Sequence, residues 1–94
     1  DAHVAAQRAL YARRRALLKP AVEAAGFTID RSEGGLYLWA TEGRDAWESV
    51  DRLADLGILV GPGHFYGTHF PNHVRFSLTA TDERIAAAAE RLRA

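Results

Sequence analysis

The chain has no cysteine and no methionine, and its single lysine is Lys19. Without cysteine, neither disulfides nor thiolate metal ligands can hold the fold, which fits a reducing compartment, and we expect a cytoplasmic protein. No apolar run approaches the length of a membrane span, and no signal-peptide pattern opens the sequence. Because the sequence starts at Asp1 and lacks Met, we expect it to be a piece of a larger protein.

An excess of charge of either sign is also missing. The 94 residues include 12 Lys and Arg and 12 Asp and Glu, so the formal net charge is zero. Nucleic acids and anionic membranes select proteins with a net basic face, so we expect neither as a partner. Hydrophobic residues make up 48% of the chain, which is enough for one globular domain with one modest core.

Apolar periodicity and turn residues predict the element order α-β-β-α-β-β-α. Apolar side chains three and four apart indicate helices, and alternation of apolar with polar side chains indicates strands. The predicted elements are a helix from Ala2 to about Ala25, strands at Phe27–Arg31 and Leu36–Ala40, a helix from the N-cap Asp45 to Gly57, strands at Ile58–Val60 and within His73–Thr81, and a helix after the N-cap Thr81. These elements predict a two-layer α+β sandwich, in which a small mixed sheet packs against helices.

Three residues in and after the first helix give separate expectations. Pro20 removes a helix hydrogen-bond donor, so we expect a kink or a break there. Gly26 is well placed as the residue that follows the helix end. Arg14 projects between two apolar stripes, so either its stem lies over apolar surface with its head in water, or it pairs with a neighbouring domain absent from this chain.

Arg75 stands in the middle of the polar face of the last predicted strand. Val74, Phe76 and Leu78 form the apolar face of that strand. A guanidinium is a planar fork that can bind a carboxylate through two parallel hydrogen bonds, and a strand fixes its direction. Two interpretations stay open at this point: an anion-binding arginine, or a solvated arginine in a surface ion pair.

A glycine-rich loop at Gly61–Gly67 precedes this strand. It lacks the Gly-Lys-Ser/Thr ending of a phosphate-binding loop, and no helix starts after it, as a dinucleotide fingerprint requires. Its glycines favour tight turns close to another surface. Phe65 and Tyr66 are too apolar for a solvated loop, so we expect them to pack on a ligand or on a missing domain.

No complete catalytic constellation is visible in the sequence. His64, His69 and His73 lie close together, but their spacing matches no common zinc pattern and no carboxylate lies among them, so we expect no metal site. No serine occupies a nucleophile turn, which argues against a Ser/His/Asp hydrolase. Three aromatic residues at strand and helix spacing are expected in the core rather than in a ligand box. They are Tyr37, Trp39 and Trp47.

Several stretches of the sequence follow one another in the same order as in a known protein family. They are Tyr11–Leu18 followed by Gly26–Phe27, then Glu33–Trp39, Gly57–Gly63 and His73–Leu78. In this order they resemble the C-terminal small domain of class I/II pyridoxal-phosphate-dependent aminotransferases of fold type I, over essentially the whole chain. Two further stretches look most like the succinyldiaminopimelate aminotransferases of lysine and cell-wall biosynthesis. They are Pro62–Gly67 and Leu78–Arg84.

The resemblance implies a role for five residues in substrate binding. Arg75 occupies the position of the family's arginine that binds the substrate α-carboxylate. The turn that contains Gly35 and Tyr37 would line the substrate entrance, together with Phe65 and Tyr66 of the glycine-rich loop. These five positions are therefore the candidate substrate-binding residues.

The family's other functional groups have no match in this chain. Its Schiff-base lysine, its pyridinium-pairing Asp and most of its phosphate-binding groups belong to the large domain, and Lys19 lies in no cofactor motif. Residues 1–94 are thus expected to form a single small domain, with no catalytic, cofactor-binding or metal-binding residue of its own. The chain alone is not expected to be active, and pyridoxal 5'-phosphate would be bound mainly by the absent large domain.

The implied function is amino-group transfer between an amino acid and a 2-oxo acid such as 2-oxoglutarate, with N-succinyl-LL-2,6-diaminopimelate as a candidate donor. The family is usually homodimeric, so we expect a homodimer. Two other classes stay open: a non-catalytic amino-acid-binding regulatory domain that would use the same Arg75, and a structural or dimerisation domain. Regulatory modules usually have a βαββαβ order, whereas this sequence opens with a long helix.

Overall fold

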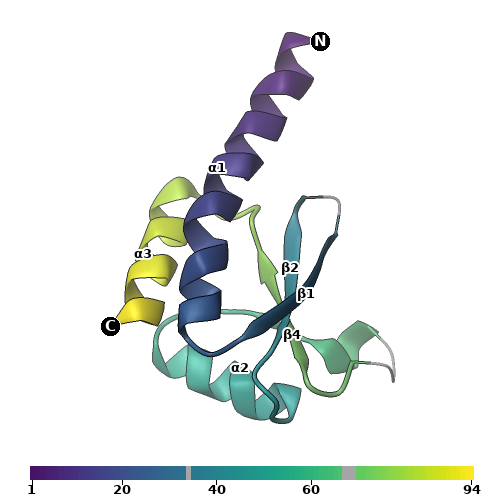
Figure 1. Ribbon diagram of the computed structural model, residues 1–94, viewed down its shortest axis with the longest axis vertical. Helices are drawn as coiled ribbons and strands as arrows, with labels where there is room; N and C mark the ends of the chain where they lie inside the picture. The colour runs from purple at the N-terminus through teal and green to yellow at the C-terminus, as the bar shows by residue number, and fades with distance from the viewer. Residues whose placement is uncertain (34, 67–69) are drawn as a thin grey trace.

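The computed structural model describes residues 1–33, 35–66 and 70–94, without the side chains of residues 31–33. Three helices lie on one side of a four-stranded sheet, which confirms the predicted α+β class and the predicted element order (Figure 1). The helices are α1 (Ala2–Ala24), α2 (Ala46–Asp55) and α3 (Asp82–Arg93), and the strands are β1 (Thr28–Glu33), β2 (Tyr37–Thr41), β3 (Gly61–Pro62) and β4 (His73–Ser77). A short 3-10 helix, η1 (Gly63–Tyr66), separates β3 from β4.

The sheet has the strand order β1-β2-β4-β3, so β2 is a central strand as predicted. All three neighbouring pairs of these four strands are antiparallel, and the prediction of a mixed sheet is therefore wrong. The reason is topological. Strands β2 and β3 run in the same direction and are joined through α2, as in a parallel crossover unit, but β4 inserts between them and pairs with both.

One side of the sheet forms the core. Leu38 and Ala40 of β2 and Val74 and Phe76 of β4 are all at most 2% exposed. All three helices contribute to the same cluster, which Leu18, Val22, Leu53, Ile85 and Ala89 join from the helix side. Because side chains alternate along a strand, Arg75 and its neighbours of the same parity project from the opposite side of the sheet.

Helix α1 is continuous through Pro20, so of the kink or break expected there, the break does not occur. Leu18, Ala21 and Val22 are buried on either side of this proline, which is itself exposed. Their packing holds the helix despite the missing hydrogen bond. The predicted helix end is confirmed, because Gly26 follows the C-cap residue with a φ of 102°.

Two predicted N-caps are confirmed. The Asp45 carboxylate accepts a hydrogen bond from the Trp47 backbone amide (3.0 Å), and the Thr81 hydroxyl accepts one from the Arg84 amide (3.2 Å). Arg14 has a partner inside the chain: it donates to Asp82 Oδ1 (2.8 Å) and to the Leu78 carbonyl (2.9 Å). Both earlier interpretations of Arg14 are therefore corrected, because this residue ties α1 to the start of α3.

The predicted strand at Ile58–Val60 is wrong. Pairing with β4 begins at Gly61, which lies opposite Arg75, and includes Pro62. Ile58 is buried, but the Leu59 side chain is 88% exposed. An apolar, branched run favours a strand, but a strand also needs a partner to complete its ladder. None of the described strands pairs with these three residues.

Candidate functional site: an arginine on the open side of the sheet

Arg75 lies at the centre of the sheet on the side that the helices do not cover. It is directly opposite Trp39 of β2 and Gly61 of β3. Two neighbouring strands therefore fix the backbone of Arg75 by ladder hydrogen bonds, so its side chain starts from a rigid point. The alternation seen in the sequence predicted this placement correctly.

The guanidinium of Arg75 contacts two tyrosine rings. Its Cζ atom lies 3.9 Å from the centre of the Tyr37 ring and 4.3 Å from the centre of the Tyr66 ring. Such distances are typical of cation–π pairs. Among the side chains that the structure describes, no carboxylate pairs with Arg75. The other interpretation, in which Arg75 is a solvated arginine in a surface ion pair, thus has no support in the described part of the chain.

Tyr66 is held in turn by a buried aromatic residue. Its ring meets the Trp39 ring edge-on at 5.2 Å, and Trp39 is 3% exposed. Trp39 also packs on Phe70, with ring centres 4.7 Å apart. Sequence reasoning placed Trp39 in the core but missed that it supports Tyr66. The signal was available in the sequence. Side chains alternate along a strand, so Trp39 points away from the side of the sheet that carries Leu38 and Ala40 and toward the side that carries Arg75.

Phe65 points to a different neighbour. It is 67% exposed and packs edge-on against Trp47 (5.6 Å). Trp47 stacks on His64 at 6.2 Å, and His64 Nε2 lies 3.0 Å from Asp45 Oδ1. The prediction that Trp47 is a core residue is wrong, because Trp47 is 46% exposed. The buried side of α2 is formed by Ala46, Ser49 and Leu53 instead.

The five candidate residues are thus only partly brought together. Arg75, Tyr37 and Tyr66 form one contact group, and Phe65 lies at its margin, with its ring 5.6 Å from that of Trp47 and 6.5 Å from that of Tyr66. Gly35 lies in the turn between β1 and β2 with a φ of 73°, which suits glycine. Its neighbour Gly34 lies outside the described residues.

The histidines do not gather into a metal site in the described part of the chain. His73 Nε2 contacts Asp30 Oδ2, and its buried Nδ1 atom has no hydrogen-bond partner. His64 pairs with Asp45, and His69 lies outside the described residues. No group of three or more potential metal ligands occurs among the described residues.

Glu42 forms a charge cluster that the sequence did not reveal. Burial would raise the pKa of Glu42, but hydrogen bonds from Arg52 (2.7 Å) and Ser49 (2.6 Å) and the nearby Arg44 outweigh it and lower that pKa. The carboxylate is therefore charged and satisfied by groups of α2. We interpret this cluster as structural, because it leaves no free acid or base.

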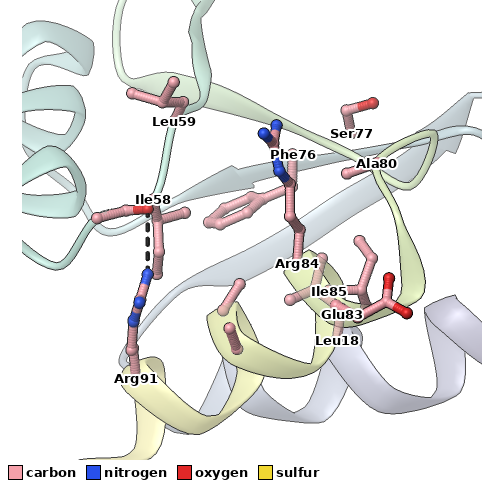
Figure 2. Close-up of a pocket in the computed structure, with 13 residues that line it drawn as sticks. Leu18, Ile58, Leu59, Phe76, Ser77, Ala80, Glu83, Arg84, Ile85 and Arg91 are labelled. Carbon is pink, nitrogen blue, oxygen red and sulfur yellow. Dashed lines mark hydrogen bonds between the residues drawn. The ribbon is translucent and has the colours of Figure 1, made fainter.

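An apolar groove of about 510 Å³ lies elsewhere, beside α3 (Figure 2). Its walls include Ile58, Leu59 and Phe76 on one side and Ile85 on the other, and Arg91 donates to the Gly57 carbonyl at 3.4 Å. This groove is bordered by the helix-covered core and not by the tyrosine pair of Arg75. We do not include it in the candidate site.

Comparison with known proteins shows the family of the chain. The sequence profile of the family Aminotransferase class I and II matches residues 1–92. The chain belongs to this family. The α+β arrangement of the chain is that of the solved aminotransferase structures it matches.

Three similar proteins show how much of an aminotransferase is present. The 4-dedimethylamino-4-oxo-anhydrotetracycline transaminase OxyQ of Streptomyces rimosus is 61% identical over 98% of this chain, which covers 26% of that protein. The aspartate aminotransferase of Thermus thermophilus, solved with maleate, is 32% identical with a TM-score of 0.81, over 98% of this chain and 24% of its own. A probable N-succinyldiaminopimelate aminotransferase, also from Thermus thermophilus, is 28% identical with a TM-score of 0.73, over 89% of this chain and 23% of its own.

The chain thus spans about a quarter of the length of the proteins it matches. Enzymes of this family depend on pyridoxal phosphate, which needs a lysine for its Schiff base. Lys19 is the one lysine of the sequence, and it lies on α1, which packs on the side of the sheet opposite Arg75. Lys19 therefore does not lie on the side of the sheet that carries Arg75. Among the described residues, no helix has both the length and the apolar character needed to cross a membrane.

Proposed function

We propose that this chain is the small C-terminal domain of a pyridoxal-phosphate-dependent aminotransferase, and that Arg75 binds the α-carboxylate of its substrates. The substrates would be an amino acid and a 2-oxo acid such as 2-oxoglutarate. The large domain, with the lysine and the phosphate site, would be in the rest of the protein. The complete enzyme would be a cytoplasmic homodimer.

The state of Arg75 is the observation that supports this proposal best. It is fixed on a central strand, contacts two aromatic rings, and has no carboxylate partner among the described side chains. By contrast, Arg14 forms an ion pair with Asp82 of the same chain, and Arg52 forms one with Glu42. An arginine that is held in place and has no counter-ion among the described side chains is suited to an incoming anion.

Arg75 would contribute binding and orientation. Two parallel N–H groups of its guanidinium would hold a carboxylate as a bidentate pair, which fixes the direction of the bonds at the neighbouring α-carbon. The cofactor, when bound, supplies an electron sink for that carbon. The aromatic residues around Arg75 would exclude water and strengthen the ion pair.

The amino donor is a narrower part of the proposal. Similarity to a probable N-succinyldiaminopimelate aminotransferase supports N-succinyl-LL-2,6-diaminopimelate as the donor, and hence a role in lysine biosynthesis. The similarity to a transaminase named for an anhydrotetracycline derivative points to another substrate. Both substrates should be assayed with glutamate as a common reference.

Substitution of Arg75 in the full-length protein tests the proposal. Arg75→Ala removes the carboxylate contact, and a hydrogen bond to a charged group is worth about 1.5–3 kcal/mol, so we expect kcat/KM to fall by at least roughly tenfold. Arg75→Lys should recover part of this loss, because an ammonium keeps the charge but lacks the planar fork. Steady-state kinetics with glutamate and 2-oxoglutarate measure both effects.

Equal kinetics for Arg75→Ala and the parent would refute the carboxylate assignment. A separate check concerns the cofactor. The full-length protein should show a visible absorption band that borohydride removes and that an amino donor bleaches. A colourless protein that gains no band from added pyridoxal phosphate would refute the enzyme proposal.

A further inference from the structure

The two tyrosines that contact Arg75 come from separate segments of the chain. Tyr37 opens the central strand β2, and Tyr66 ends η1. The Cζ atom of Arg75 lies over both rings, at 3.9 Å and 4.3 Å from their centres. One guanidinium therefore contacts both rings at once, at distances typical of cation–π pairs.

The structure around Tyr66 keeps its ring in this position. Trp39 supports the ring from the side at 5.2 Å and is itself buried. Gly61, which faces Arg75 across the β3–β4 pair, leaves room for the ring: a Cβ atom at position 61 would lie 3.1 Å from the Tyr66 hydroxyl. Tyr66 thus fits over Arg75 partly because residue 61 has no side chain.

Such an arrangement has a physical consequence for anion binding. Cation–π contacts use the ring faces and leave the N–H groups at the edge of the guanidinium free to donate. A free arginine side chain loses considerable rotamer entropy when it binds a ligand. If two rings already restrict the side chain, most of that loss occurs on folding and not on binding.

We propose that Tyr37 and Tyr66 are positioning residues for substrate binding, because both rings contact the Arg75 guanidinium, restrict its movement and so direct its donors toward the carboxylate. This inference rests on the function proposed above. It assigns Tyr66 a role through Arg75, separate from any direct contact with substrate.

Three substitutions in the full-length protein test the positioning roles of Tyr66 and Tyr37. Tyr66→Leu keeps an apolar side chain but removes the ring, so KM for glutamate and for 2-oxoglutarate should rise together by about two- to thirtyfold, as expected for a cation–π contact of about 0.5–2 kcal/mol. Tyr66→Phe keeps the ring and should stay near the parent. Tyr37→Leu should resemble Tyr66→Leu.

The split between KM and kcat separates positioning from damage to the fold. A positioned carboxylate contact is made in both the ground state and the transition state, so its weakening raises KM and leaves kcat nearly unchanged. A partly misfolded variant lowers the apparent kcat through loss of active protein. Tyr11→Leu is a matched control, because Tyr11 carries the other described tyrosine–arginine contact of its kind, with Arg14 at 5.8 Å, on α1. It should leave both KM values unchanged.

Gly61→Ala provides an independent test that leaves both tyrosines in place. The new methyl group would press on the Tyr66 hydroxyl and displace the ring, so KM should rise, by less than in Tyr66→Leu. Adding Tyr66→Phe removes the hydroxyl, after which the nearest ring atom is 3.6 Å from the methyl group. The double variant should therefore recover the KM of the Tyr66→Phe single variant.

The outcomes distinguish this inference from the function on which it rests. If Arg75→Ala raises KM but Tyr66→Leu and Tyr37→Leu do not, the positioning role is wrong and the carboxylate assignment stands. A KM that falls in Tyr66→Leu would show that Tyr66 covers Arg75 and competes with substrate, which also overturns the inference. If Arg75→Ala has no effect, both proposals fail.

Discussion

The absence of a side chain at Gly63 allows two backbone segments of this chain to pack closely. A Cβ atom there would lie 2.1 Å from the Phe70 carbonyl oxygen and 2.8 Å from that of His73. Both are backbone atoms, which cannot rotate away as a flexible side chain can. Gly63 therefore permits the close approach of η1 to the segment that leads into β4.

We predict that Gly63→Ala destabilises the protein by about 1–3 kcal/mol, because the backbone must shift to admit the methyl group. The denaturant midpoint of the full-length protein measures this loss. Gly43→Ala is a suitable control: Gly43 has a φ of 86° but open space around it, so that variant should lose about 1–2 kcal/mol through backbone conformation alone. An unchanged midpoint for Gly63→Ala would contradict the close packing described here.

At the scale of single residues, the sequence predicted what depends on near neighbours. The caps Asp45 and Thr81 bond to amides within three residues, and the alternation around Arg75 fixed the side of the sheet on which it lies. It did not predict the contact of Tyr66 with Arg75, because that contact depends on how η1 folds back over β4. The exposure of Trp47 was missed for a similar reason, since the apolar spacing of a helix does not show which other segment will cover it.

Among the elements, α1 shows most clearly how tertiary packing overrides local propensity. Its last two turns are held by Leu18, Ala21 and Val22, and its first half stands clear of the other elements (Figure 1). Proline inside a helix removes one hydrogen bond and crowds the preceding turn. The helix continues nonetheless, because the core holds the residues on both sides of Pro20.

Pro20→Ala should therefore stabilise the protein. An interior helical proline costs roughly 3 kcal/mol relative to alanine, and the gain is reduced by about 1 kcal/mol because alanine has a more flexible unfolded chain. We expect a net gain of about 1–2 kcal/mol, seen as a higher thermal midpoint of the full-length protein. Substitution of the exposed Ala12 by Gly should lower the midpoint slightly and serves as the opposite control. A lower midpoint for Pro20→Ala would mean that the proline ring itself contributes to packing.

In the sheet, a high local strand propensity does not produce a strand where no partner strand is available. Ile58–Val60 has a strong strand composition, but the described structure offers these residues no neighbouring strand, and β3 is confined to Gly61–Pro62. The sheet was expected to be mixed, but β4 inserts between the two same-direction strands that α2 joins, so every described neighbouring pair is antiparallel. Strand insertion cannot be read from local sequence, because it depends on the order in which distant segments pair.

For the molecule as a whole, two carboxylates link stability to pH. Hydrogen bonding from Arg14 lowers the pKa of Asp82 below its usual 3.8, and the Arg52 and Ser49 bonds lower the pKa of Glu42 below 4.5 despite burial. Each group is thus more acidic in the folded state than in the unfolded state. Its contribution is present above the unfolded pKa and is lost as the pH falls through the folded pKa.

We predict that the thermal midpoint is insensitive to these two groups near neutral pH and falls steadily once the pH drops below about 4.5. Thermal unfolding of the full-length protein between pH 7 and pH 3 measures this dependence. Glu42→Gln should give a lower midpoint at neutral pH and a flatter acid limb, because the linked proton is absent. A Glu42→Gln acid limb as steep as that of the parent would show that Glu42 makes no contribution.

The order in which β2 and β4 pair has a consequence for the folding pathway. These adjacent strands are separated along the chain by α2, β3 and η1, so their pairing must close a long loop, whereas the β1–β2 hairpin is local. Arg75 gains Trp39 and Tyr37 as neighbours only when that long-range pairing forms. Any folding intermediate that has the hairpin and helices but not the β2–β4 pair would thus be unable to recognise a carboxylate, and Trp39 fluorescence would report the moment at which that ability appears.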